Sequence, residues 1–196
     1  MILEGIITTV GVDGRVHITP MGPIVDASMR EMVLRPYQTS TTYQNLKRTG
    51  QAIFHVTDDV ELVAHAAVGE VDPLPPLRPA DAVNGFVLVD ACRWYALKVR
   101  KLDDTLPRTE IVADVVDRGT QRDFFGFNRA KHAVVEASIL ATRLEFLPLD
   151  DVLRDFSRLA PLVQKTGGPA EKRAFEFLED YVRSAVRNLG EVDMTS

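Results

Sequence analysis

Apolar and polar residues alternate, or apolar residues form short runs, along the first 117 residues. About seven such segments lie between residues 2 and 117, among them Ile2–Val10, Arg15–Thr19 and Ala52–Val56. A period of two predicts β-strands, and most connections are too short for parallel crossovers, which favours antiparallel pairing. We therefore expect a barrel, closed or partly closed, because so many short strands must bury one face.

The periodicity changes to that of helices after residue 127. Asn128 is the predicted N-cap of a first helix, and two further apolar stripes begin near Asp150, a predicted cap, and at Pro169. The last two stripes predict an αα-hairpin. The sequence thus predicts two parts: a barrel over residues 1–127 and a helical region over residues 128–196, which packs on the barrel or on a second copy.

Two segments interrupt the predicted strands. Glu61–Val68 is Ala-rich, with apolar residues at helical spacing, and Asp58 and Asp59 precede it. These acids either cap that segment or bind a cation, and capping is the commoner role of such residues. The segment Asp72–Pro79 contains four prolines in eight residues. We expect it to be irregular, because proline excludes both helix and central strand.

Composition and charge argue against several classes of binding partner. The 196 residues carry a net charge of −5, and the basic residues form no cluster, whereas nucleic-acid binders usually present a basic face. No apolar run reaches the roughly 18 residues of a membrane span, and the first ten residues lack a signal-peptide pattern. We expect no nucleic acid, no membrane and a cytoplasmic location. Cys92 is single, which excludes an internal disulfide.

One stretch, Leu34–Val56, reads as strand, polar turn, short helix and strand. Pro36 ends the first strand, because it cannot donate to a ladder. Gly50 is the natural C-cap of the helix. A short helix is expected over Tyr43–Arg48, and since Ser and Thr favour N-caps, the hydroxyl-bearing run before it is expected to cap it: Thr39, Ser40, Thr41 and Thr42.

This layout is suited to an anion. A helix N-terminus presents unpaired N–H groups and a partial positive charge, and the Arg35 guanidinium can bind phosphate bidentately. Neither a P-loop nor a Rossmann fingerprint is present. The alternative is a hydroxyl-rich turn that only caps its helix, and local sequence leaves both interpretations open.

Other catalytic chemistry is missing from the sequence. The histidines at positions 17, 55, 65 and 132 form no metal-ligand pair, one cysteine supports no thiolate site, and no G-x-S-x-G motif occurs. His55 lies in a strand and is expected to be structural. We therefore expect no metal, and chemistry that comes from a bound cofactor.

The segments HITPMG, LRPYQTSTTYQNL and FHVTDD together resemble the FMN-binding split-barrel superfamily. Within it, the chain is similar to an uncharacterised archaeal and bacterial family with a helical C-terminal extension, and FGFNRAKHAVVEASILATR resembles that family's second recurrent block. The resemblance implies a mainly β fold with α: an antiparallel split β-barrel of flavin reductase type, plus C-terminal helices. It also implies a homodimer with FMN at the interface.

The resemblance further implies roles for particular residues. Arg35 and the Thr39–Thr42 run would hold the FMN phosphate, and Asn45 would orient their loop. Beside the isoalloxazine ring, the implied residues are His17, Thr19, Pro20 and Met21. From the partner subunit, they are Asn128, Arg129 and Lys131. For this last group the alternative is that Asn128 caps a helix and the two cations form a solvated face.

The leading functional hypothesis is an oxidoreductase of flavin reductase type, with hydride passing through flavin N5 and a nicotinamide or another electron donor as partner. A second is a flavin-binding or interaction module without its own turnover. A third keeps the barrel but places a deazaflavin or another phosphorylated ligand in it. FMN is preferred over FAD, because the sequence has one phosphate-sized polar cluster and no dinucleotide fingerprint.

Overall fold

Eight strands and five helices follow one another along the described part of the chain. The computed structural model describes residues 1–69 and 71–193, with side chains up to residue 185. The elements are β1 (Gly5–Val10), β2 (Val16–Met21), β3 (Glu31–Leu34), α1 (Thr41–Thr49), β4 (Gln51–Val56), α2 (Val60–Ala67), β5 (Leu77–Pro79), β6 (Phe86–Leu88), β7 (Arg93–Asp103), β8 (Glu110–Thr120), α3 (Arg129–Ala141), α4 (Leu149–Thr166) and α5 (Pro169–Asp193).

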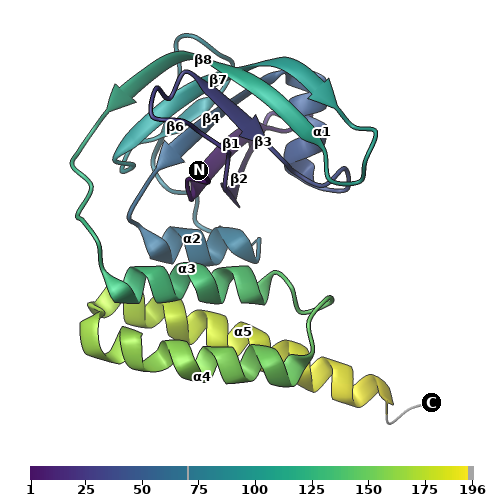
Figure 1. Cartoon of the computed structure of the whole chain (residues 1–196), viewed down its shortest axis with the longest axis vertical. Helices are drawn as coiled ribbons and strands as arrows, with labels where there is room; N and C mark the ends of the chain where they lie inside the picture. The colour runs from purple at the N-terminus through teal and green to yellow at the C-terminus, as the bar shows by residue number, and fades with distance from the viewer. Residues whose placement is uncertain (70, 194–196) are drawn as a thin grey trace. The chain divides into compact units, whose positions relative to one another are not determined.

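The strands build an antiparallel barrel, as predicted. Six of them form one sheet in the order β2-β1-β4-β7-β8-β3. Just beyond the end of β2, Ile24 exchanges two backbone hydrogen bonds with Val33 of β3, at 2.9 and 3.0 Å. The two edges of the sheet are joined through this bridge, so the sheet curls into a split barrel around α1 (Figure 1).

Strand alternation divides the barrel residues between an inner and an outer face. Ile7, Phe54 and Tyr95 are register partners on three adjacent strands and belong to one buried apolar cluster. Tyr43 and Leu46 of α1 join the same cluster, so α1 fills part of the barrel interior. The helix ends at Gly50, whose φ of 65° is the left-handed conformation that glycine adopts at low cost.

The outer face of β1, β4 and β7 is covered by the small hairpin β5–β6. Pro79 pairs with Phe86 at one end of this hairpin. The expectation that the whole segment Asp72–Pro79 is irregular was therefore wrong at its last three residues. Proline is excluded from central strands, but it is tolerated in a short strand that pairs on one side only.

His55 fixes this hairpin to the barrel. Its ring is fully buried; Nε2 accepts a hydrogen bond from the Leu88 amide at 3.1 Å, and Nδ1 lies 3.3 Å from the Ile6 carbonyl oxygen. Nδ1 therefore carries the proton, and the imidazole is neutral. Burial lowers the pKa of His55 to about 3, so the sequence expectation of a structural histidine is confirmed.

Four helices form a second unit, to which α2 belongs although it lies between β4 and β5 in sequence. One unit comprises Met1–Asp58 and Val71–Phe124, and the other comprises α2 and the chain from Phe125 onward (Figure 1). The sequence predicts a single boundary at 127/128, whereas the chain also enters and leaves the helical unit around α2. A short amphipathic segment cannot show from its own sequence which neighbour will cover it.

One predicted helix start in this unit was wrong. α4 begins at Leu149 after Pro148, without a side-chain cap, so Asp150 lies in its first turn. The unit has its own apolar core, with Val134, Phe156 and Leu178 among its members. In the described part of the chain, the helices are all too short or too polar to span a bilayer; cytoplasmic location stays a prediction.

Candidate anion site in the barrel unit

The loop between β3 and α1 has the geometry of a helix N-terminus prepared for an anion. Ser40 is the N-cap: its Oγ accepts a hydrogen bond from the Tyr43 amide at 3.2 Å and donates one to the Tyr37 carbonyl at 2.7 Å. The first turn of α1 contains no acidic residue. Of the first three amides of α1, the Ser40 cap satisfies that of Tyr43. The amides of Thr41 and Thr42 have no hydrogen-bond partner among the described residues.

The hydroxyl run therefore divides by role. The Ser40 hydroxyl is committed to the cap, as the sequence predicted for this run. Thr39 and Thr41 are exposed and make no side-chain hydrogen bond with the described residues, whereas Thr42 is buried. Two hydroxyls and two amides thus remain to meet a ligand at this end of α1.

A second loop, between β7 and β8, holds the β3–α1 loop in place. Thr109 donates two hydrogen bonds to the Pro36 carbonyl oxygen, from its amide at 3.0 Å and from its buried hydroxyl at 2.8 Å. The Gln38 side chain donates to the carbonyl oxygens of Asp104, at 2.6 Å, and Leu106, at 2.9 Å. A loop held at several points does not need to be ordered by its ligand, which lowers the cost of binding.

Asp104 also fixes α1 itself. Its carboxylate accepts a hydrogen bond from the Tyr43 hydroxyl at 2.6 Å and one from the Lys47 ammonium at 2.9 Å. The Lys47 and Tyr43 side chains hold the pKa of Asp104 below its usual value. The clamp is not predictable from local sequence, because the residues that form it lie 57 to 73 positions apart and local patterns carry no information about such pairs.

Arg35 is the residue that points most directly to a ligand. It follows β3 immediately, and its Nε is buried without a hydrogen-bond partner among the residues that the structure describes. A buried unsatisfied donor costs about 1–3 kcal/mol, and more when it is charged. Native proteins rarely keep such groups unless something outside the chain satisfies them.

The residues predicted beside the flavin ring lie on β2, but they do not share one face. His17 is paired with Thr9, Thr19 with Ile7 and Met21 with Gly5. Because side chains alternate, these three residues face the side of the sheet that carries the interior cluster. Pro20 lies on the opposite side. His17, Thr19 and Met21 therefore offer one set of side chains, and Pro20 can contribute only its backbone carbonyl.

Asn45 connects α1 to this strand pair. Its Nδ2 donates to the Thr9 hydroxyl at 3.0 Å, and both side chains are buried. Thr9 is the register partner of His17, so Asn45 and His17 lie near the same position of β1. Burial lowers the pKa of His17, so that neutral imidazole is favoured at neutral pH. Asn45 is thus placed to position α1, as its predicted role in orienting the loop requires.

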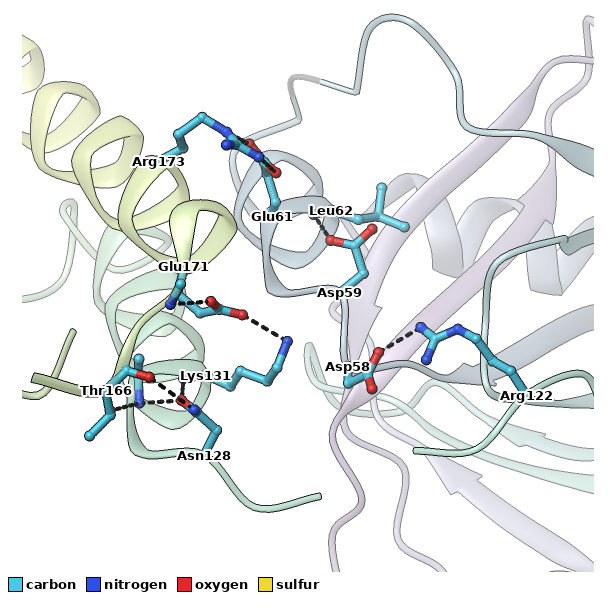
Figure 2. A network of polar contacts seen from close by, with 12 residues as sticks. Asp58, Asp59, Glu61, Leu62, Arg122, Asn128, Lys131, Thr166, Glu171 and Arg173 are labelled. Atoms are coloured by element: carbon cyan, nitrogen blue, oxygen red, sulfur yellow. Dashed lines mark hydrogen bonds and ion pairs between the residues drawn. The ribbon is translucent and has the colours of Figure 1, made fainter. Parts of the chain in front are cut away.

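The block at Asn128–Lys131 belongs to the helical unit, where two of its members have structural contacts (Figure 2). Asn128 Oδ1 caps α3 by accepting from the amides of Ala130 and Lys131, and its Nδ2 donates to the Thr166 carbonyl at 3.0 Å. The Lys131 ammonium pairs with Glu171 at 2.8 Å, largely buried. The alternative that Asn128 acts as a cap is confirmed.

Arg129, by contrast, is exposed and makes no ion pair or hydrogen bond with the described residues. It is the member of the block whose side chain stays available to a ligand. Asp59 caps α2 by accepting from the Leu62 amide at 3.0 Å, and Asp58 pairs with Arg122 at 2.6 Å (Figure 2). The prediction of capping over cation binding is confirmed for Asp59, and the described residues include no cluster that could hold a metal.

Family models match most of the chain. Residues 3–122 match the model described as "Protein of unknown function (DUF447) N-terminal domain", and residues 128–180 match "Protein of unknown function (DUF447)". A comparison with curated proteins found no match.

Solved structures resemble the chain to different extents. The FMN-bound protein MM1853 from Methanosarcina mazei is 24% identical with a TM-score of 0.78, over 92% of this chain and 94% of that one. The 2-nitrobenzoate 2-nitroreductase NbaA of Pseudomonas fluorescens is 14% identical with a TM-score of 0.51, over 60% and 64%. An FMN-binding protein from Thermus thermophilus, with bound 1-cyclohex-2-enone, is 14% identical with a TM-score of 0.50, over 61% and 70%. The shared fold is the flavin reductase-like split barrel.

Proposed function

Because the chain belongs to the DUF447 family over both its parts, and because its barrel carries a buried, unsatisfied arginine donor five residues before the N-cap of α1, we propose that it binds FMN. The Arg35 donor is the observation that carries the proposal. A phosphate would supply the missing acceptor and would also meet the free amides of α1. The FMN in the Methanosarcina mazei relative supports the choice of ligand.

The residues of the chain would hold the cofactor at its two ends. Arg35 and the amides of Thr41 and Thr42 bind the phosphate, and the side chains of Thr39 and Thr41 add hydroxyl donors. The strand end at Thr19–Met21 borders the ring, where backbone N–H groups can meet its polar edge. Bound FMN supplies hydride and electron transfer, chemistry that the side chains of this unit do not provide.

We further propose that the protein is an oxidoreductase of flavin reductase type, which takes electrons from a nicotinamide or another donor. The nitroreductase named above has the same fold and supports this class. The competing proposal is a flavin-binding module without turnover. One observation favours the module without turnover: burial lowers the pKa of His17, and this makes His17 a poor proton donor for a reaction at the flavin.

We propose a homodimer in which the two copies share the flavin site. Large apolar side chains stay exposed on the single chain, notably Phe125 at 80% and Phe127 at 95%. Exposed aromatic groups of this kind are typical of protein interfaces. Light scattering should give twice the chain mass of 21.8 kDa. A monomer that binds FMN tightly would contradict the shared site.

The test of the proposed function starts with the purified protein. We expect a yellow protein that releases FMN on denaturation, identified by mass spectrometry, or an apoprotein that is reconstituted by FMN. Release of FAD, of a deazaflavin or of no flavin after reconstitution would overturn the FMN proposal. Flavin bleaching by NADH or NADPH under anaerobic conditions, within seconds, supports the reductase; reduction over many minutes supports the module without turnover.

A further inference from the structure

Two arginines on β7 and β8 share an open hollow of about 290 Å³, lined by Arg93, Tyr95, Arg118, Gly119 and Thr120. Arg93 is paired with Thr120, and Tyr95 with Arg118. Since side chains alternate along a strand, these four residues lie on one face of the strand pair. The two guanidinium groups are therefore diagonal neighbours over the same hollow.

Neither guanidinium has a carboxylate partner within the described residues. Arg100, further along β7, contacts both Glu31 and Asp114, and Arg122 pairs with Asp58. Like charges placed close together across two strands are destabilising. In a chain with a net charge of −5, two neighbouring arginines without acids are an unfavourable arrangement unless an anion joins them.

The chemistry of the hollow matches an oxyanion. Guanidinium forks bind phosphate and carboxylate groups bidentately, and Thr120 adds a hydroxyl at the same place. We propose that Arg93 and Arg118 bind the phosphate or carboxylate group of a small molecule. The ligand would lie between the two guanidinium groups, with the Tyr95 ring as the apolar wall of the site.

This hollow is distinct from the site at Arg35. Leu34, which precedes Arg35, is paired with Ile111 of β8, and Arg118 lies seven residues further along that strand. At about 3.3 Å per residue, roughly 23 Å of strand separate the two positions. A single phosphate therefore cannot serve both, and the hollow takes a second anion.

The register connects the hollow with the predicted ring end of the flavin site. Pro20, Ile6, His55 and Trp94 are register partners in one row across β2, β1, β4 and β7. Met21 follows Pro20 and Arg93 precedes Trp94, on the same side of this row. At about 4.8 Å per strand, Met21 therefore lies roughly 14 Å from Arg93. The next step rests on the proposed function. If the protein binds FMN, the oxyanion in the hollow belongs to the molecule that exchanges electrons with the flavin.

The test is calorimetric titration of the FMN-loaded protein with inorganic phosphate and, separately, with succinate. FMN occupies the Arg35 site, so binding reports on the hollow. We expect saturable binding of at least one probe, weakened about tenfold or more by Arg93→Gln and by Arg118→Gln. The ion that binds more tightly identifies the ligand as a phosphate or as a carboxylate compound.

Arg100→Gln is the matched control, because it removes the same charge from β7 outside the hollow. We expect it to leave both titrations unchanged, and all three variants to retain FMN affinity. Absence of saturable binding for both probes, or equal losses in all three variants, overturns the proposal. If the protein does not bind FMN, the same titrations on the Arg35→Met apoprotein test the hollow independently of the proposed function.

Discussion

Replacement of Arg35 separates a ligand-binding role from a structural one. Arg35→Met keeps an apolar stem of similar length and removes the guanidinium, whose Nε is buried without a partner among the described residues. A structural arginine would lose hydrogen bonds within the chain on this change. Arg35 makes none there, so the loss should appear only when a phosphate is present.

The expected magnitudes follow from the same observation. A hydrogen bond to a charged group contributes about 1.5–3 kcal/mol, so Arg35→Met should weaken FMN binding about tenfold to a hundredfold. Arg35→Lys should restore part of the affinity, because an ammonium keeps the charge but not the fork. Without ligand, Arg35→Met should unfold at the same urea concentration as the wild type or a higher one, because an unsatisfied buried donor has been removed.

The assay is flavin fluorescence titration with FMN and with riboflavin, which lacks the phosphate. We expect a large loss for FMN and almost none for riboflavin. Arg30→Met, an exposed arginine just before β3, serves as the control for a general loss of positive charge. Equal losses for both flavins, or a clear drop in apoprotein stability, would refute the assignment of Arg35 to the phosphate.

Three further outcomes can be measured. Burial keeps His55 neutral in the folded state, with a pKa of about 3 against 6.5, so only the unfolded state binds a proton there as pH falls below about 6.5. The unfolding free energy measured in urea should therefore drop by about 2 kcal/mol between neutral pH and pH 5. His55→Gln should make the unfolding free energy less dependent on pH over this range. Lys131→Met leaves the buried Glu171 carboxylate without its cation and should lower the unfolding free energy by about 2–4 kcal/mol. The double variant with Glu171→Leu should recover most of the lost unfolding free energy. A double variant no more stable than Lys131→Met would contradict the role of the ion pair. Arg129→Ala should weaken FMN binding less than Arg35→Met does and leave stability unchanged, as fluorescence titration and urea unfolding would show; unchanged FMN affinity would remove Arg129 from the site.

Local sequence determined the ends of several helices. Asn128 and Asp59 cap their helices as predicted, the cap of α1 is Ser40 of the predicted hydroxyl run, and Gly50 ends α1. Such caps depend on hydrogen bonds within about three residues and on one backbone conformation, so the residue types nearby are sufficient to predict them. The same locality explains the failure at Asp150, since Pro148 also suits a helix start and the sequence does not rank the two.

Strand periodicity likewise determined the barrel. Seven predicted segments and short connections required antiparallel pairing around one interior, and the sheet closes through Ile24 and Val33. The pattern did not determine the register, and the register decides which residues share a face. On β2 it separates Pro20 from Met21, and on β7 and β8 it brings Arg93 and Arg118 together.

Periodicity and capping residues thus predicted most strands and helices, and the loop that could receive an anion. Which polar groups remain available to that anion depends on the folded structure. Thr109 and Asp104, distant in sequence, hold the loop, and Lys131 is committed to Glu171. Arg35, by contrast, has a buried Nε that no described residue accepts a hydrogen bond from. Burial and pairing depend on segments that meet only in the folded chain, because the free energy of a polar group is set by its surroundings rather than by its neighbours in sequence.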